Sequence, residues 1–225
     1  MIQLFRLSKK FGPNLVLNDI ELRIREGEFV FVTGPSGAGK TTLLRLIFGA
    51  EKPASGYILI NSINLNRISG PKLDLLRRKI GFIFQDFKLL PKKTVFENVA
   101  IALEVTGLRP KFIRKKTHQT LRLVGLAEKE MAYPLSLSGG EQQRVAIARA
   151  IVKDPLILLA DEPTGNLDPE LTREIMGLFR RIHQKGTTIV VATHSRELLG
   201  DTDYRTIILN RGQIYEDIDT PVRSP

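Results

Sequence analysis

Glycines, a lysine and two threonines gather between residues 34 and 42, in a pattern that suits phosphate binding. A glycine, four further residues and then Gly39-Lys40-Thr41 make the spacing of a phosphate-binding loop. Glycines let backbone N–H groups curl around phosphate oxygens, because no Cβ stands in the way. We expect the Lys40 ammonium on the β- and γ-phosphate oxygens, the Thr41 hydroxyl on Mg²⁺ and Thr42 near the α-phosphate. The expected nucleotide-binding residues of this loop are Gly34, Pro35, Ser36, Gly37, Ala38, Gly39, Lys40, Thr41 and Thr42.

Two acidic residues follow an apolar run later in the chain, and their types suit metal binding and proton transfer. Residues 156–160 read Leu-Ile-Leu-Leu-Ala and lead directly to Asp161 and Glu162. A carboxylate at the carboxyl end of a buried strand lies where open α/β sheets place their ligands. We therefore expect Asp161 to hold Mg²⁺ through water, and Glu162 to be the general base for the attacking water.

The segment Leu-Ser-Gly-Gly-Glu-Gln at residues 137–142, here called the signature segment, offers a second place for an anion. Ser138 followed by Glu141 is a capping box, so a helix is expected to begin here. Gly139 and Gly140 leave backbone N–H groups bare at that helix N-terminus, which attracts anions. Because the chain already has one phosphate site, we expect this second site to bind the γ-phosphate held by another copy. The expected assembly is a two-fold dimer in which Ser138, Gly139, Gly140 and Glu141 cover Lys40 of the other copy.

The apolar pattern supplies the elements that must hold these residues. Residues 29–32 form a continuous apolar run, which is typical of a strand buried on both faces, and 41–47 suit the helix that follows the loop. Between about 87 and 152 the pattern turns helical. The sequence thus predicts an α/β core that is interrupted by a helical insertion. Further strands are expected at 80–84, 156–160, 188–192 and 206–209, and a further helix at about 170–184.

The composition excludes some classes of protein. The 225 residues are 42% hydrophobic, which is enough for a core, and contain no cysteine, so disulfides and cysteine-bound metals are excluded. The net charge is 34 − 24 = +10, and six Lys/Arg with no acid fall between Arg109 and Arg122. A solvated face is the first interpretation of that stretch, an anionic membrane surface the second and nucleic acid the third. Because no nucleic-acid recognition motif accompanies the bases, direct nucleic-acid binding is not expected.

The sequence contains no candidate membrane span. A spanning helix needs about 20 apolar residues, and the runs at 156–160 and 188–192 are far shorter. The residues after Met1 are strand-like, and no charged start leads into an apolar stretch, so a secretory signal is not expected. We expect a soluble chain, or one that is held at a membrane by a partner.

Taken together, these motifs resemble those of the ABC-type ATPases, and the resemblance runs from about residue 2 to residue 215. The motifs occur in that family's order and approximate spacing. They are the phosphate loop, Gln85, the signature segment, Asp161-Glu162, Asn166-Leu167-Asp168 and His194. The resemblance implies ATP as the nucleotide, with Mg²⁺, and hydrolysis as the reaction.

The resemblance also implies roles for residues whose types alone say little. Gln85 would sense Mg²⁺ and the attacking water, and so join Thr41 and Asp161 around the metal. His194 would act in hydrolysis by bonding the γ-phosphate. Asp168 would lie in a loop that crosses the dimer interface. Phe11 stands where the family commonly has a tyrosine that stacks on adenine, and a phenylalanine ring keeps that stacking.

The fold that the resemblance implies is α/β, with a P-loop NTPase core of the ABC type, a small antiparallel β subdomain and a helical insertion. Residues 1–225 would form a single domain. Within it, residues 1–86 and 153–225 would make the nucleotide-binding core with the β subdomain. Residues 87–152 would make the helical subdomain that carries the signature segment.

Three strings, at 84–90, 94–100 and 159–168, resemble the branch that holds the ATPases of cell division, lipoprotein release and macrolide export. The cell-division type is the most similar. It implies a homodimerising ATPase on the cytoplasmic face of the bacterial inner membrane, which drives an integral membrane partner. With the division machinery, that complex would regulate cell-wall hydrolases. A groove near residues 84–99 is expected to bind a partner helix. The expected apolar contacts are Phe87, Leu89, Leu90 and Val95, of which at least half are expected to fill the core instead.

Three alternatives stay open at this point. The first is a transporter of the same branch, which moves lipoprotein or drug. The second is an ATPase that acts on DNA, but such proteins usually carry a long coiled coil before the signature segment, and no heptads occur here. The third is a scaffold that binds ATP without using it. The expected hydrolysis residues are all present, which argues against a scaffold but allows slow turnover without a partner.

Overall fold

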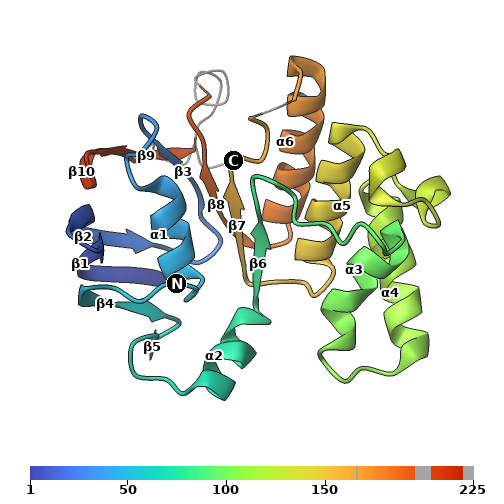
Figure 1. Cartoon of the computed structure of the whole chain (residues 1–225), viewed down its shortest axis with the longest axis horizontal. Helices are drawn as coiled ribbons and strands as arrows, with labels where there is room; N and C mark the ends of the chain where they lie inside the picture. The colour runs from blue at the N-terminus through green and yellow to red at the C-terminus, as the bar shows by residue number, and fades with distance from the viewer. Residues whose placement is uncertain (166, 196–203, 220–225) are drawn as a thin grey trace.

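The computed structural model describes residues 1–165, 167–195 and 204–219 (Figure 1). Asn166, which belongs to the string before Asp168, lies outside these residues. A larger sheet of mixed direction has the strand order β10-β9-β3-β8-β7-β6. Its strands are β3 (Phe29–Thr33), β6 (Ile80–Ile83), β7 (Ile157–Asp161), β8 (Thr188–Ala192), β9 (Arg205–Asn210) and β10 (Gln213–Ile218).

The central strands of the larger sheet are parallel, and β3, β6, β7 and β8 are buried at every residue. Continuous apolar runs form such strands because helices or a second sheet cover both faces. The register pairs Asp161 at the end of β7 with Ala192 at the end of β8. Residues that follow these strands, such as Glu162 and His194, therefore meet at one edge of the sheet.

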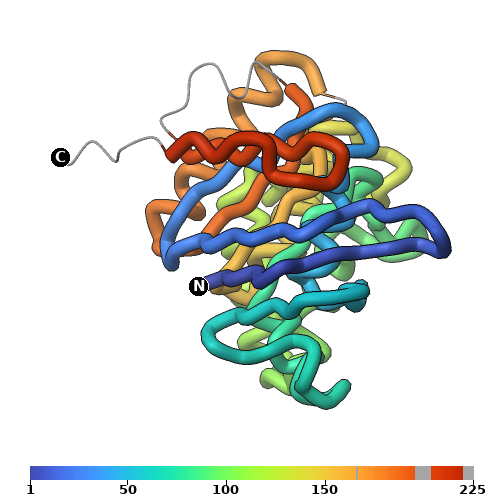
Figure 2. The backbone as a smooth tube through the Cα atoms, turned by 90° about the vertical axis from the view of Figure 1, so that its left-hand side faces the viewer, coloured from blue at the N-terminus to red at the C-terminus, as the bar shows by residue number. Residues whose placement is uncertain are grey.

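A smaller antiparallel sheet has the order β2-β1-β4-β5. Figure 2 shows this sheet from its outer side, with the β9–β10 hairpin next to β2. The Asn18 N–H donates to the Gly212 carbonyl at 2.8 Å and so links β2 to that hairpin. The strands of the smaller sheet are β1 (Ile2–Phe11), β2 (Asn14–Ile24), β4 (Ser55–Ile60) and β5 (Ile63–Asn64).

Helices complete three layers around the larger sheet. One core contains Phe29 and Phe31 of β3 together with helices α3 to α6. The other contains Val30 and Val32 of the same strand together with α1 and the smaller sheet. Alternate residues of β3 therefore serve opposite layers. The helices are α1 (Lys40–Ile47), α2 (Gly70–Arg77), α3 (Val95–Glu104), α4 (Pro110–Leu123), α5 (Gly139–Ile151) and α6 (Pro169–His183).

The stretch from 87 to 152 is helical only in part. Residues 87–94 form an irregular loop in which Phe87 and Lys88 have left-handed backbones, and α3 begins after it, capped by the Thr94 side chain. Helices α3, α4 and α5 then pack together at the side of the larger sheet that α5 and α6 cover (Figure 1). Among the described residues, no helix is both long and apolar enough to span a bilayer.

Candidate active site

The phosphate loop joins the end of β3 to the start of α1 through glycines in unusual conformations. Gly34, Gly37 and Gly39 have φ values of 141°, 77° and 104°, which side chains rarely adopt. A Cβ on Gly34 would lie 2.0 Å from the carbonyl oxygen of Leu209, and one on Gly39 would lie 2.5 Å from Leu17. Gly34 is thus required by the close approach of the β9 backbone as well as by its backbone angle, whereas the contact at Gly39 is with the end of a side chain.

The Lys40 side chain is folded into the loop. Its ammonium donates hydrogen bonds to the carbonyl oxygens of Gly34 at 2.8 Å and Pro35 at 3.2 Å. The same nitrogen lies 3.7 Å from Glu162 Oε1, and both side chains are largely buried. A cation at this point would meet phosphate oxygens that enter the loop.

The Thr41 hydroxyl and the Asp161 carboxylate meet although they are far apart in sequence. Thr41 Oγ1 donates to Asp161 Oδ1 at 2.9 Å, which joins the start of α1 to the end of β7. Burial raises the pKa of Asp161, the hydrogen bond from Thr41 opposes that change, and the charge of Glu162 adds to it. A bound cation would relieve this burial cost, and both oxygens are hard ligands, so the pair fits Mg²⁺.

Glu162 and His194 lie side by side at the ends of β7 and β8. His194 Nδ1 is 2.9 Å from Glu162 Oε1, and the His194 backbone N–H donates to Glu162 Oε2 at 3.3 Å. The Glu162 backbone is left-handed, with a φ of 47°, and its N–H donates to the Ala192 carbonyl. These contacts hold the carboxylate at the mouth of the phosphate loop.

A cleft of about 740 Å³ collects most of the residues that the sequence singles out. Gly34, Ala38 and Asp161 are not part of its lining, although the first two shape the loop and Asp161 bonds Thr41. Val16 of β2 lines the cleft and was not predicted, since its contact with the loop is made only by tertiary folding. The lining residues are Phe11, Val16, Pro35, Ser36, Gly37, Gly39, Lys40, Thr41, Thr42, Gln85, Glu162 and His194.

Phe11 stands at the rim of this cleft, at the end of β1. Its side chain is 44% exposed, which is unusual for a core aromatic, and Lys9 Nζ lies 4.6 Å from the ring centroid. An exposed ring beside a phosphate loop presents a flat apolar surface to a base.

Gln85 lines the 740 Å³ cleft and also a neighbouring one of about 370 Å³. Thr41 is shared between the two clefts in the same way, and Asp161 lines the second. The second cleft extends over Phe82, Phe84 and Asp86, that is, along the end of β6 and the loop after it. A movement of the Gln85 side chain would therefore alter the lining of both clefts.

Two residues that the sequence did not single out anchor the loop after Gln85. The Asn98 side chain is fully buried; it accepts from the Leu90 N–H and donates to the carbonyl oxygens of Leu90, Lys93 and Thr94. The Arg149 guanidinium donates to the carbonyl oxygens of Phe87 and Lys88, and burial lowers its pKa. Neither residue type signals such a role without knowledge of the fold.

One expectation about this loop is wrong. Val95 was expected to contact a partner helix, but its side chain is fully buried in the core. It is the first residue of α3 and belongs to the core that helices α3 to α6 share. Phe87 and Leu89 are partly buried against the same core, whereas Leu90 is 37% exposed.

The signature segment is not part of the cleft formed by its own chain. Ser138 caps α5: its Oγ accepts from the Glu141 N–H, and Glu141 Oε2 accepts from the Ser138 N–H at 2.9 Å. Ser138 and Gly139 are exposed, whereas Gly140 is buried, and a Cβ there would meet Leu171. Asp168 is exposed and caps α6 by accepting from the Leu171 N–H.

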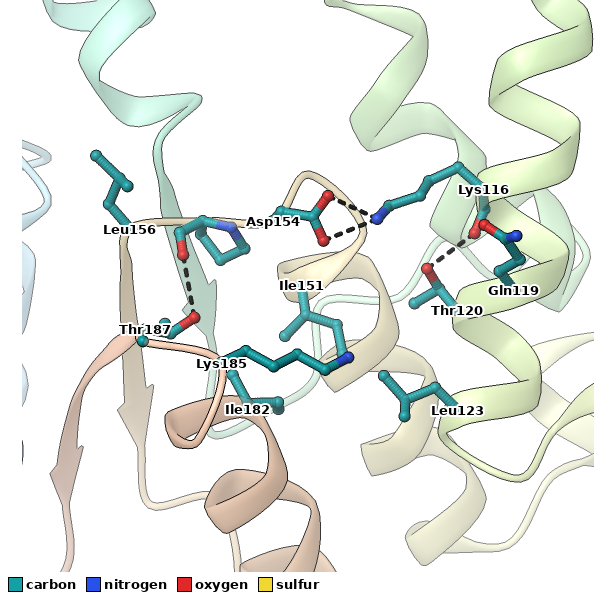
Figure 3. Close-up of a pocket in the computed structure, with 12 residues that line it drawn as sticks. Lys116, Gln119, Thr120, Leu123, Ile151, Asp154, Leu156, Ile182, Lys185 and Thr187 are labelled. Atoms are coloured by element: carbon teal, nitrogen blue, oxygen red, sulfur yellow. Dashed lines mark hydrogen bonds and ion pairs between the residues drawn. The ribbon is translucent and has the colours of Figure 1, made fainter. Parts of the chain in front are cut away.

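A further pocket of about 400 Å³ lies between α4 and the segments that precede β7 and β8 (Figure 3). It is lined by Gln119, Ile151 and Lys185 among others, and Lys116 Nζ bonds the Asp154 carboxylate at 2.6 and 2.8 Å across it. None of the predicted site residues lines this pocket.

The chain is similar in sequence and in fold to known proteins. The model of the family described as ABC transporter matches residues 17–165. A model of an AAA domain (putative AbiEii toxin, type IV toxin–antitoxin system) matches the shorter stretch 132–200. The cell division ATP-binding protein FtsE of Bacillus subtilis is 50% identical over 219 residues, which are 96% of each chain.

Proteins whose names give a different function are also similar to this chain. The methionine import ATP-binding protein MetN of Rhizobium johnstonii is 44% identical over 218 residues, which are 96% of this chain and 60% of that protein. The structure of the ATP-binding cassette MJ0796, a dimer in a post-hydrolysis state bound to ADP and phosphate, superposes with a TM-score of 0.90 at 37% identity. The match covers 98% of this chain and 99% of that one.

The family model covers most of the chain, and the fold agrees with the cassette structure over nearly its whole length. The strand ends also bring together a phosphate loop, a carboxylate pair and a histidine. The chain therefore belongs to the ABC transporter family, has the α/β fold of its ATP-binding cassettes, and is an ATPase.

Proposed function

We propose that the chain binds ATP with Mg²⁺ in the 740 Å³ cleft and hydrolyses it there. The observation that carries this proposal is the 2.9 Å contact between Thr41 and Asp161, with Glu162 held beside Lys40. Backbone N–H groups of the phosphate loop and the start of α1 would bind the phosphate oxygens. Phe11 would stack on the adenine base.

The residues divide the chemistry among them. Thr41, Asp161 and Gln85 would hold Mg²⁺, which supplies charge stabilisation to the phosphates when bound. Phosphate oxygens would replace the carbonyl and carboxylate contacts of Lys40. Glu162, freed from that contact, would accept a proton from the attacking water, and His194 would bond the γ-phosphate.

We further propose that two copies close on ATP with the signature segment of each over the cleft of the other. Three features support this. Ser138 and Gly139 are exposed, they do not line the cleft of their own chain, and they begin a helix whose N-terminal end attracts anions. The similar MJ0796 cassette is a dimer. Asp168 would lie at the same interface. Residues 87–152 would form the helical subdomain that carries the signature segment.

The membrane partner that we propose is an integral membrane protein of the FtsX type, on the cytoplasmic face of the inner membrane. Closing and opening of the dimer would change the conformation of that partner and, with the division machinery, regulate cell-wall hydrolysis. The match to FtsE, at 50% identity over 96% of each chain, supports this choice over MetN, of which only 60% is matched. The cleft beside Gln85, which Phe84 and Lys88 also line, would receive the partner. A lipoprotein-release or macrolide-export transporter of the same branch is the second candidate.

Purification of the complex tests the cellular part of the proposal. The Glu162→Gln variant, tagged and loaded with ATP, would be recovered from detergent-extracted membranes, with Lys40→Ala as the matched control that lacks ATP binding. Mass spectrometry should find an FtsX-type protein with Glu162→Gln and less of it with the control. Recovery of a lipoprotein- or drug-handling permease instead would reject the division function and keep the ATPase site.

A further inference from the structure

The corner where α3 ends and α4 begins exposes apolar side chains that the ATPase site does not use. Val105 follows α3, Leu108 lies in the connecting turn and Phe112 lies in the first turn of α4. The Phe112 side chain is 51% exposed, and those of Val105 and Leu108 are exposed to a similar extent. Large apolar side chains grouped on a surface mark sites of interaction.

The same corner is strongly basic. Between residues 105 and 127 the sequence has no acid, and the nearest acids along the chain are Glu104 and Glu128, both exposed. In the part of the chain that the structure describes, none of the exposed bases of this corner forms an ion pair, whereas the sixth base, Lys116, pairs with Asp154. The unpaired exposed bases are Arg109, Lys111, Arg114 and Lys115 near the corner itself, and Arg122 in the last turn of α4.

Helical geometry brings the bases and Phe112 to one surface. Thr117, Thr120 and Leu121 are buried and fix the inner side of α4. Phe112 and Lys115 are three residues apart, so they lie together on the opposite side, and Lys111 lies in the same part of the helix. Arg122 is on the same side but in the last turn of α4, about two turns beyond Lys115. The corner lies at the periphery of the helices, at the end opposite to the start of α5 (Figure 1). We call Val105, Leu108, Phe112 and the five unpaired bases the α4 patch.

We propose that the α4 patch docks directly onto the surface of an anionic lipid bilayer. Each base near such a surface is attracted to the lipid headgroups, and an exposed phenylalanine between bases can enter the headgroup boundary. The corner projects as the tip of two packed helices, which suits a flat surface better than it suits an acidic peptide. This inference goes beyond the ATPase function, because it needs neither ATP nor a protein partner.

The α4 patch lies away from the nucleotide cleft and from the signature segment. The nucleotide cleft lies at the carboxyl ends of the parallel strands, and α5 begins on that side of the molecule (Figure 1). A bilayer bound at the α4 patch would therefore leave the signature segment accessible. Lipid contact would hold the ATPase at the membrane while its dimer opens.

The first test uses the fact that the chain has no tryptophan. In the full-length Phe112→Trp variant the indole is the only one present, so its fluorescence reports on this position alone. The matched control is Tyr215→Trp, which places an indole at an exposed position on β10. With vesicles of phosphatidylcholine and phosphatidylglycerol, emission should shift to the blue for Phe112→Trp and stay unchanged for Tyr215→Trp. With phosphatidylcholine alone, neither should shift.

The second test measures the charge dependence by vesicle sedimentation of the purified chain. Neutralising Lys111 and Lys115 (K111Q with K115Q) should weaken binding about 25-fold, since each base contributes about five-fold. Neutralising Arg180 and Arg181, two exposed bases on α6, removes the same charge and should change binding less than about two-fold if the patch is specific. ATPase activity should be unchanged in both variants.

Three results would overturn the proposal. One is that the chain does not bind the anionic vesicles, or that Phe112→Trp shows no blue shift when it does. The other is an equal loss of binding in the two charge variants, which would mean that net charge alone acts. A patch that cross-links to an acidic protein segment but ignores vesicles would also reject lipid docking. None of these results depends on the ATPase or division proposals, because the experiments contain only the chain and lipid.

Discussion

The Lys40 ammonium and the Glu162 carboxylate lie 3.7 Å apart, and both side chains are largely buried. A buried pair of charges is costly to separate unless a new partner replaces each contact. Phosphate oxygens can replace Glu162 at Lys40, and His194 already contacts Glu162 at 2.9 Å. When a nucleotide enters, its phosphate oxygens would therefore take the place of Glu162 at Lys40 and free Glu162 to act as the proposed base.

Two glycines of the phosphate loop should differ sharply when changed to alanine. Gly34→Ala places a Cβ 2.0 Å from a backbone carbonyl, so we expect a loss of about 3 kcal/mol or more of stability and of ATP binding. Gly37 has a left-handed φ but open space around it, so Gly37→Ala should cost only about 1 kcal/mol. Urea unfolding and nucleotide titration measure both. Equal effects would mean that backbone angle alone, and not contact with Leu209, requires Gly34.

The start of α5 shows how one element can serve two purposes. The Ser138–Glu141 capping box stabilises the helix within one chain, and it leaves Ser138 and Gly139 exposed. Glu141 also bonds Lys129 at 2.8 Å, which ties the helix to the loop before it. Local stability and the proposed contact with a second copy thus involve the same residues, and mutations must be chosen to separate them.

The capping contribution should depend on pH. The hydrogen bond from Lys129, followed by that from the Ser138 backbone, lowers the pKa of Glu141. A carboxylate whose pKa is lower in the folded chain stabilises it above the unfolded pKa, and that stabilisation disappears as the pH falls through the folded pKa. Wild type should therefore be more stable than Glu141→Gln at neutral pH, with the difference vanishing in acid. Denaturant unfolding across that range measures it, with Glu128→Gln as the control. A difference that is constant with pH would refute the ionic contribution.

The substitution Ser138→Arg separates the two purposes of this element. A long cation at the helix start should block the approach of a second copy, while the capping loss should cost only about 1 kcal/mol. ATP binding by the single chain should be unchanged, and ATP-dependent dimerisation should be lost. Ser138→Ala, which loses the cap without adding bulk, is the control and should keep part of the dimerisation. If both variants fail equally in ATP binding, Ser138 acts through folding alone.

At the scale of the whole molecule, two cores on opposite faces of one sheet fix the strand ends at which the site is built. The sequence predicts this well, because the continuous apolar runs at β3, β7 and β8 are long enough to identify as buried strands. The phosphate loop and the carboxylate pair are also predictable, since short motifs dictate their local geometry. Val16, Asn98 and Arg149 were missed because their contacts arise only from tertiary packing. Val95 was misjudged because an apolar residue looks the same in a groove and in a core.

The mass of the Glu162→Gln variant in solution with MgATP shows most plainly whether two copies close on ATP. The amide cannot accept the proton of the attacking water, so hydrolysis should fall by about 10²- to 10⁴-fold while ATP still binds. Light scattering after size exclusion should then give about twice the 25.3 kDa of one chain, and adding Lys40→Ala should abolish this increase. A Glu162→Gln chain that hydrolyses ATP at the wild-type rate, or that has the same mass with and without ATP, would contradict the account.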